Sequence, residues 1–374
     1  MDVLQIDTTR KDHVKRFIQL PFRLYRGCSQ WVPPIESDVR LQLNRQKHPY
    51  YEHSDADFFL AVQENNDVGR IALLENRSYN AYHDSRTAFF YHFECVEDPA
   101  VAAALFARAL EWSHKRGLNK VIGPKGLGVL DGMGFLVEGF EQRAAMTMML
   151  YNPPSYPAFA ETAGFGKEVD FVSCHITAAQ FSLPERVHSI ADKVKARGQL
   201  RVVTFRNKAE LRAMAPRIGR AYNQAFVDNW EYIPISDAEV ALVVKDLVAI
   251  ADPRLIKVIL HGDDVVGFLF AFPDLSAAIQ RSKGRLFPFG VVDLLLEYRR
   301  TKWVIVNGAG ILPQFQGRGG NALLYSEMEK TIKQAGFVHA DLTQVAETAV
   351  QMRRDLENLG GVPYKNHRVF GRKV

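Results

Sequence analysis

The sequence predicts a mixed α/β protein built from two related halves. The chain has 374 residues, of which 47% are hydrophobic, and this suits two domains of ordinary size. A strand–turn–strand pattern occurs twice, at 57–74 and at 255–271. In each half, helix patterns then alternate with strand patterns, which is the order of an α/β fold.

Both repeated segments read as β-hairpins. Each has an apolar run, a turn rich in Asn and Asp, a Val-Gly pair and a second apolar run. The pairs Val68-Gly69 and Val266-Gly267 lie 198 positions apart. This common order of features indicates a diverged internal duplication.

The helices and strands after the hairpins also correspond. Helices that end at Gly117 and Gly336 each lead into an apolar strand, and these glycines lie 219 positions apart. The increase in spacing predicts an insertion in the second half at about 274–300. Each half is therefore expected to run strand, two helices, three strands, helix, strand, helix, strand.

A polar segment separates the halves. It contains Pro184 and a polar helix at 185–197, followed by Gly198. We interpret 179–198 as a solvated linker helix. The predicted domains are residues 1–178 and residues 199–374.

Composition excludes several classes. No apolar run reaches the roughly 18 residues of a membrane span, and the polar first 16 residues do not resemble a signal peptide. Three widely spaced cysteines fit a reducing cytoplasm rather than a disulfide framework. The net charge of +5 comes from two zones, 281–302 and 353–374, each with six basic and two acidic residues. We therefore expect no nucleic-acid partner.

The strongest chemical motif follows a strand near 303–312. There Gln316-Gly317-Arg318-Gly319-Gly320-Asn321 leads directly into a helix. Strand, glycine-rich turn and helix can bind a phosphate, because backbone amides and the helix N-terminus point at it. The motif lacks the Gly-Lys-Ser/Thr ending of a P-loop and the GxGxxG of a Rossmann fold. On spacing alone, phosphate binding and an ordinary tight turn remain equally open.

These residues resemble the acyl-CoA motif of the GNAT acetyltransferase superfamily, R/Q-x-x-G-x-G/A. The resemblance covers roughly 199–374, and the first half resembles a second GNAT-like unit that has the acidic Glu97-Asp98-Pro99 in place of the turn. The whole chain also resembles a bacterial family of tandem GNAT-like proteins, some of which resemble bacterial ceramide synthases. The resemblance implies two twisted, mixed and mainly antiparallel sheets, each flanked by helices.

The resemblance also implies a site for acetyl-CoA or a longer acyl-CoA. Two strands would splay to form a slot, with an amine attacking the thioester directly and no metal involved. The backbone residues that would bind this co-substrate are Gly310, Ile311, Leu312, Gln316, Gly317, Arg318, Gly319, Gly320 and Asn321.

The catalytic acid and base are harder to assign. Many members of the superfamily carry a tyrosine four residues before the closing glycine as the thiolate acid, but this position is Leu356 here. Tyr325 and Tyr364 are substitute candidates, although either can be a packing residue. Glu347 is the first candidate base, with a helix N-terminal acid as the alternative. Glu231 is a second candidate that would bind the amine.

Two further segments are candidates for the acceptor side. Asn229 and Trp230 follow a helix and resemble the loop that shapes the acceptor site, where Trp230 is either a lid or a core plug. The insertion 281–300 sets an apolar stretch between basic flanks, which suits an interfacial or lipid-binding segment and equally an ordinary packing segment. The eleven histidines show no metal-ligand spacing, so we propose no metal site.

Together these features predict a cytoplasmic N-acyltransferase that acts on a primary amine. A small soluble amine and a sphingoid or other lipid amine are both open as acceptors, as is peripheral contact with the inner face of the membrane. A non-catalytic acyl-CoA-binding or sensing protein is the alternative function. The sequence does not determine the oligomeric state.

Overall fold

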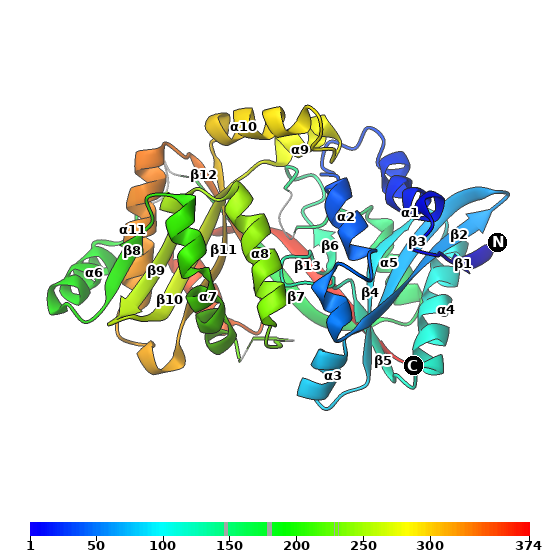
Figure 1. Cartoon of the computed structure of the whole chain (residues 1–374), viewed down its shortest axis with the longest axis horizontal. Helices are drawn as coiled ribbons and strands as arrows, with labels where there is room; N and C mark the ends of the chain where they lie inside the picture. Colours follow the sequence, from blue (N-terminus) through cyan, green and yellow to red (C-terminus); the bar gives the residue numbers. More distant parts are fainter. Residues whose placement is uncertain (146–148, 178–181, 228, 231) are drawn as a thin grey trace. The chain divides into compact units, whose positions relative to one another are not determined.

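The computed structural model describes residues 1–145, 149–177, 182–227, 229–230 and 232–374 (Figure 1). Its contacts divide the chain into two compact units. Unit 1 contains Met1–Val172, Leu275–Glu297 and Tyr364–Val374, and unit 2 contains Ser173–Asp274 and Tyr298–Pro363.

Unit 1 is built on a mixed sheet with the strand order β1-β2-β3-β4-β5-β13-β7, and β6 also pairs with β13. The β4 and β5 strands run parallel, whereas β1–β2, β2–β3, β3–β4 and β5–β13 are antiparallel. The strands are β1 (Asp2–Gln5), β2 (Asp55–Gln63), β3 (Asn66–Glu75), β4 (Thr87–Cys95), β5 (Lys120–Gly123), β6 (Phe135–Glu138), β7 (Gly166–Thr177) and β13 (Val362–Lys373).

Helices cover this sheet and close its core. On α4, Leu105 and Phe106 are buried, and the Phe106 ring stacks on Phe93 of β4 with a centroid distance of 4.6 Å. The helices of unit 1 are α1 (Lys11–Leu24), α2 (Glu36–Gln42), η1 (Pro49–Glu52), α3 (Arg77–Tyr82), α4 (Pro99–Lys115), α5 (Ser155–Thr162), α9 (Ser276–Ser282) and most of α10 (Gly290–Arg300).

Unit 2 repeats this plan. Its strand order is β7-β12-β11-β10-β9-β8, where β7 contributes its last residues. The β11–β12 pair is parallel, whereas β8–β9, β9–β10 and β10–β11 are antiparallel. The strands are β8 (Arg201–Thr204), β9 (Ile256–His261), β10 (Asp264–Pro273), β11 (Trp303–Ile311) and β12 (His339–Ala346). The helices are α6 (Glu185–Arg197), α7 (Lys208–Ala225), α8 (Asp237–Ile250), η2 (Pro253–Leu255), η3 (Pro313–Phe315), α11 (Gly320–Ala335) and α12 (Val350–Asn358).

The two hairpins predicted from the sequence are β2–β3 and β9–β10. In the first turn, Glu64 and Asn65 have φ values of 49° and 62°, which is the left-handed geometry of a two-residue hairpin turn. In the second turn, Gly262 has a φ of 58°. The expected insertion is also present, as α9 and α10.

The compact units divide the chain differently from the predicted domains. The insertion contacts unit 1, although it interrupts the second half of the sequence. The last strand, β13, also completes unit 1, where Phe370 pairs with Gly123 of β5 and is buried in the core. The end of β7, from the first half of the sequence, belongs to unit 2, and most of β13, from the second half, belongs to unit 1. A single boundary at 178 or 199 therefore does not separate the two units.

The α6 helix is not a solvated linker. Ala191 and Val194 on α6 are buried in the core of unit 2. Lys195 pairs with Glu327 of α11 at 2.5 Å, and His188 lies 3.0 Å from Glu329 of the same helix. The apolar face of α6 is narrow, with two buried positions in thirteen residues. The sequence of the helix therefore reads as polar although one face is packed.

The predicted mixed α/β class is confirmed, with helices flanking mixed and mainly antiparallel strands. The strands belong to one sheet path rather than to the two separate sheets that the resemblance implies. In the part of the chain that the structure describes, no helix has the length and apolar character needed to span a membrane.

Candidate functional site

The site in unit 2 begins where β11 and β12 separate. The two parallel strands pair only from Trp303 and His339 to Val306 and Leu342, although both continue for several residues. Between the positions where β10 pairs with Val306 and Ala309, β11 carries one extra residue, which is a bulge. Gly308 within this bulge has a φ of 93°. The bulge turns β11 away from β12 and opens the end of the sheet.

A glycine turn follows the end of β11. Gly317 and Gly319 have φ values of 72° and 84°, a region that L side chains adopt only with strain. The side chain of Gln316 donates to the carbonyl of Ile311 at 3.2 Å and closes the turn. The α11 helix starts at Gly320, so its first-turn amides have no carbonyl one turn earlier to bind. These amides can donate hydrogen bonds to an anion, and the positive end of the helix dipole would attract it.

The two sides of this turn differ. A Cβ at Gly317 would meet nothing within 4 Å. A Cβ at Gly319 would lie 2.7 Å from Val194 and 3.0 Å from Ile190, both on α6. The α6 helix therefore supports one side of the turn, and Gly317 lies on the open side.

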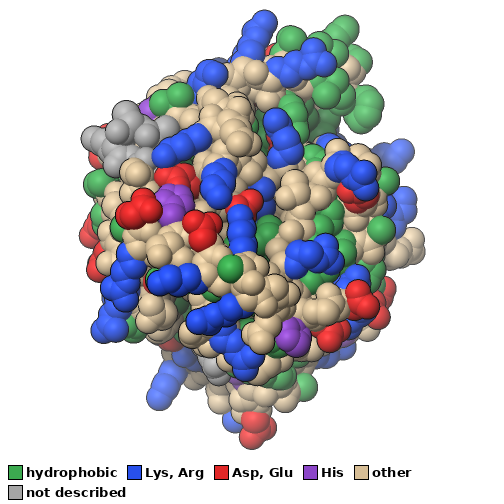
Figure 2. All heavy atoms as spheres, turned by 90° about the vertical axis from the view of Figure 1, so that its left-hand side faces the viewer, with side chains coloured by type: hydrophobic (Ala, Val, Ile, Leu, Met, Phe, Trp, Pro, Cys, Tyr) green, Lys and Arg blue, Asp and Glu red, His purple; other side chains and the backbone are tan. Residues whose placement is uncertain are grey.

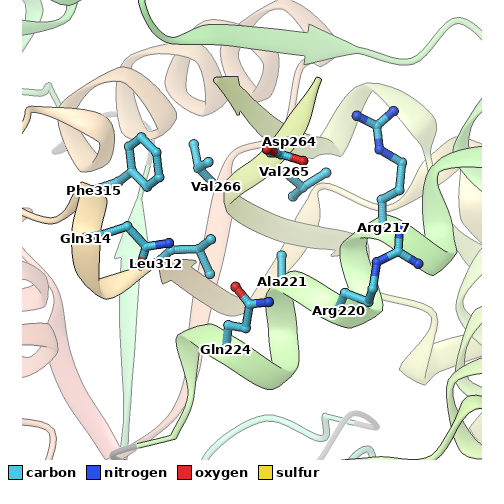
Figure 3. A pocket seen from close by; sticks show the side chains of 10 residues that line it. All are labelled: Arg217, Arg220, Ala221, Gln224, Asp264, Val265, Val266, Leu312, Gln314 and Phe315. Atoms are coloured by element: carbon cyan, nitrogen blue, oxygen red, sulfur yellow. The ribbon is translucent and has the colours of Figure 1, made fainter. Parts of the chain in front are cut away.

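A polar pocket of about 280 Å³ adjoins the turn (Figure 3). Its lining comes from α7, the start of β10 and the segment after β11, namely Arg217, Arg220, Ala221, Gln224, Asp264, Val265, Val266, Leu312, Gln314 and Phe315. Figure 3 shows the two arginines extending from α7 opposite Gln314 and Phe315. Arg318, in the glycine turn, lies over the ring of Phe315, which lines the pocket, with its guanidinium 5.1 Å from the ring centre.

The arginines of this pocket were not among the residues singled out from the sequence. Their spacing of three on one helix was the available signal, because such residues share a face. Lys and Arg side chains are also numerous on the side of the molecule that Figure 2 shows. Positive charge near the turn favours an anionic ligand.

Gly310 and Ile311 belong to the packed part of the site. A Cβ at Gly310 would lie 2.8 Å from Phe268 and 3.0 Å from Ala225. Gly310 therefore lets β10 and the end of α7 close on β11. The Ile311 side chain is buried, and the Ile311 backbone lies opposite Gly267 of β10. The structure thus places Gly310, Ile311, Leu312 and the turn along one continuous segment.

Tyr325 lies one turn after Asn321 on α11. Its hydroxyl donates to Asp355 of α12 at 3.2 Å, and the Asn321 amide donates to the same carboxylate oxygen at 3.3 Å. Burial, followed by the nearby Asp355 charge, raises the pKa of Tyr325 well above its ordinary value. These contacts favour a positioning role, because the hydroxyl hydrogen is already used. Asp355 is a second residue that the sequence did not single out.

Glu347 lies in the turn between β12 and α12 and is half-buried. It precedes the residue that caps α12, Ala349, by two positions, so it lies outside the first turn of that helix. It is therefore at the open end of the strand that diverges from β11. Its role as a base stays a prediction.

The predicted acceptor loop is described in part. Glu231 lies outside the described residues. Asn229 is exposed and Trp230 is half-buried, and the backbone amide of Asn229 donates to the carbonyl of Phe226 at the end of α7. Both interpretations of Trp230 stay open. Tyr364 belongs to β13 in unit 1, where its hydroxyl contacts the sulfur of Met149 at 3.5 Å.

Unit 1 has the same bulge with different chemistry. There the bulge of β4 lies at His92, with a φ of 49°. Glu94 lies opposite Arg70 of β3 in the same way that Gly310 lies opposite Phe268 of β10, so the two positions correspond. Glu94 accepts hydrogen bonds from Tyr25 at 2.6 Å and Tyr156 at 3.2 Å. Burial raises the pKa of Glu94 to about 7, and the opposing charge of Arg70 limits the rise.

Unit 1 has no equivalent of the glycine turn. Helix α4 starts directly at Pro99, and the Asp98 carboxylate accepts from the amide of Ala100 at 2.8 Å. The helix N-terminus is thus already capped by an acidic side chain, which opposes a second anion. Among the described residues of both units, no group of three His, Cys, Asp or Glu side chains is placed to hold a metal ion.

No family model matches the sequence. The chain is 28% identical over 378 residues to the bacterial ceramide synthase of Caulobacter vibrioides, covering 99% of this chain and 97% of that protein. It is 25% identical over 370 residues to the protein YghO of Escherichia coli, covering 97% and 94%.

Solved structures share the fold. A tandem GNAT protein from the clavulanic acid biosynthesis pathway aligns with a TM-score of 0.54 at 11% identity, covering 100% of this chain and 98% of that one. The fold is therefore that of tandem GNAT proteins, and the resemblance drawn from the sequence is confirmed.

Proposed function

We propose that unit 2 binds an acyl-CoA and that the protein transfers the acyl group to a primary amine. The observation that carries the proposal is the glycine turn at the end of β11, where β11 and β12 separate. Such a turn supplies free amides at a helix N-terminus, next to a gap between strands that suits an extended chain.

The residues present fit a CoA pyrophosphate. The amides from Gly317 to Asn321 would bind its oxygens, with the open side of Gly317 giving access. Arg318 would add a full charge, and Arg217 and Arg220 would raise the local positive potential. Backbone groups of Gly310 to Leu312 would hold the arm and polarise the thioester carbonyl.

The proposed reaction is a direct attack. The amine nitrogen bonds to the thioester carbon, the tetrahedral intermediate collapses, and the carbon–sulfur bond breaks to leave an amide and the CoA thiolate. The ammonium loses one proton before the attack, with Glu347 as the proposed base acting through water, and the nitrogen loses a second proton to solvent as the intermediate collapses to the amide. The thiolate takes up a proton from solvent. Holding both reactants in one slot would supply most of the rate.

A lipid amine is the acceptor we favour. The support is the name of the relative from Caulobacter vibrioides, which is 28% identical along almost the whole chain. A small soluble amine is the alternative acceptor.

A second candidate function is acyl-CoA binding without catalysis. Two observations favour it. The position of the usual acidic tyrosine is the buried Leu356, and the Tyr325 hydroxyl is bound to Asp355.

Release of free CoA thiol separates the two functions. Purified protein would be offered acetyl-CoA and long-chain acyl-CoA, each with a sphingoid base, a short soluble amine or no amine. Transfer predicts release that depends on an amine, and the lipid proposal predicts the fastest release with the sphingoid base. Stabilisation by acyl-CoA against heat without release by any amine would support the binding protein instead.

The turn itself is tested by Gly317→Val. The variant places a branched side chain at a φ of 72° on the open side of the turn, so we expect affinity for CoA to fall at least about tenfold. The matched control is Gly198→Val, which has a φ of 67° and nothing within 4 Å at the end of α6. Equal CoA affinities in the two variants, measured by calorimetry, would refute the pyrophosphate assignment.

A further inference from the structure

The insertion between β10 and β11 carries a large exposed apolar surface. Phe287 and Phe289 are 84% and 79% exposed, in the loop that joins α9 to α10. Three apolar residues of α10 are also exposed: Val292, Leu295 and Leu296. We call the exposed apolar residues of 287–296 the apolar tip. A contiguous set of this kind on a protein surface usually marks an interaction site.

The tip lies along one side of α10. Phe289, Val292 and Leu296 are spaced by three and four residues, so they follow one helix face. The acidic residues of α10, Asp293 and Glu297, instead face Arg281, whose guanidinium lies 3.3 Å and 2.7 Å from their carboxylates. Arg281 therefore offsets one of the two negative charges and holds both carboxylates on the side that faces α9.

The base of the insertion is firmly attached within unit 1. The Gln280 side chain donates to the carbonyl of Ser29 at 2.8 Å and to that of Trp31 at 2.9 Å. The amide of Glu36 donates to the carbonyl of Gly284 at 3.0 Å, and Ile279 is buried. The exposed tip is thus presented on an ordered base, and its exposure is not the result of an unattached loop.

Basic residues flank the tip on both sides. Lys283 and Arg285 precede it, and Arg299 and Arg300 end α10, all four exposed. Arg285 pairs with Glu36 at 3.2 Å, whereas no ion pair is recorded for the other three within the described residues. Apolar and basic side chains gather at the top of Figure 2, the level at which Figure 1 draws α10.

We infer that the apolar tip docks on an anionic lipid bilayer. Exposed phenylalanines would enter the boundary between head groups and acyl chains, while Lys283, Arg299 and Arg300 would bind the anionic head groups. Charge complementarity favours this partner over an acidic or a neutral protein surface, because the apolar residues lie between the basic groups. The inference does not depend on acyl transfer, because docking requires no CoA.

Sedimentation with vesicles tests the inference. The full-length protein would be mixed with vesicles of phosphatidylcholine alone and with vesicles containing about one third phosphatidylglycerol, at low and high salt. We expect binding to the anionic vesicles only, weakened by salt. Phe287→Ser/Phe289→Ser should reduce the partition coefficient at least about tenfold, since each ring would lose its apolar burial. Arg299→Gln/Arg300→Gln should reduce it about tenfold on anionic vesicles.

The matched control is Tyr82→Ser, which removes an aromatic ring that is 48% exposed on α3. It should bind vesicles like the unchanged protein, and all variants should keep their melting temperature because the replaced side chains are exposed. No binding of the unchanged protein to either vesicle, or equal binding of the double phenylalanine variant, overturns the inference. A dimer that the phenylalanine variant converts to a monomer, without vesicle binding, would instead assign the tip to self-association.

Discussion

The ends of β11 in unit 2 and β4 in unit 1 share a backbone and differ in chemistry. Both strands have a bulge, and both are paired in parallel with the next strand for only three or four residues. The register positions held by Phe268 and Gly310 in unit 2 are held by Arg70 and Glu94 in unit 1. The comparison teaches that the duplicated fold preserves the strand geometry. A few side chains decide whether the end of the strand packs closely, as at Gly310, or carries a buried polar network, as at Glu94.

Placing the unit 1 carboxylate in unit 2 should have the largest effect. Gly310→Glu would put a Cβ 2.8 Å from Phe268 and a carboxylate beside an apolar core, without the tyrosines that bind Glu94. We expect a loss of about 4 kcal/mol in the free energy of unfolding. Urea denaturation would measure it.

Gly310→Ala keeps this test informative if the glutamate variant does not fold. It should cost about 1–3 kcal/mol through the same close approach, and the further change Phe268→Leu should recover part of the loss. A Gly310→Glu variant as stable as the unchanged protein would show that the two positions are not equivalent in packing.

The carboxylate of unit 1 should make stability depend on pH. The pKa of Glu94 is about 7 in the folded protein, above its ordinary value of 4.5. The folded state therefore binds more protons than the unfolded chain between these values, and stability falls as the pH rises through this window. Glu94→Gln still accepts from Tyr25 and Tyr156 but does not titrate. Relative to the unchanged protein, it should gain about 2 kcal/mol between about pH 5 and pH 8.

Denaturation curves at several pH values would measure this gain. The control is Glu161→Gln at an exposed position of α5, which should follow the unchanged protein. A parallel pH profile of Glu94→Gln and the unchanged protein would contradict the raised pKa.

The smallest expected effect concerns the turn in unit 2. Asp355→Asn removes the carboxylate that accepts from both Tyr325 and Asn321, so we expect a stability loss of about 0.5–1 kcal/mol. The same change removes a negative charge near the turn and should tighten CoA binding a few-fold. Weaker binding in calorimetry would show that the Asp355 contacts position Asn321 for the ligand.

Local patterns predicted much of this molecule. The hairpins followed from alternating apolar residues and their turn residues, and the glycine turn followed from Gly317 and Gly319, which tolerate positive φ values. The insertion at about 274–300 followed from the change in spacing between the halves. Each of these features depends on residues close together in the chain.

The sequence did not reveal the site residues whose contacts come from distant parts of the chain. The pocket arginines, Asp355 and Glu94 have no distinctive neighbours in the sequence, and their surroundings come from other elements. The polar sequence of α6 predicts a solvated linker, because only a few positions of the helix are buried against the core of unit 2.

The sequence by itself determined the α/β class, the duplication and the location of the glycine turn, because all three are encoded in local periodicity and spacing. Only the tertiary structure decided that β13 completes unit 1, that α6 supports the turn, and that the apolar residues of α10 are exposed. The physical reason is that strand pairing and burial depend on which surfaces meet after the chain has folded, and the same apolar pattern serves a core or an exposed face equally well.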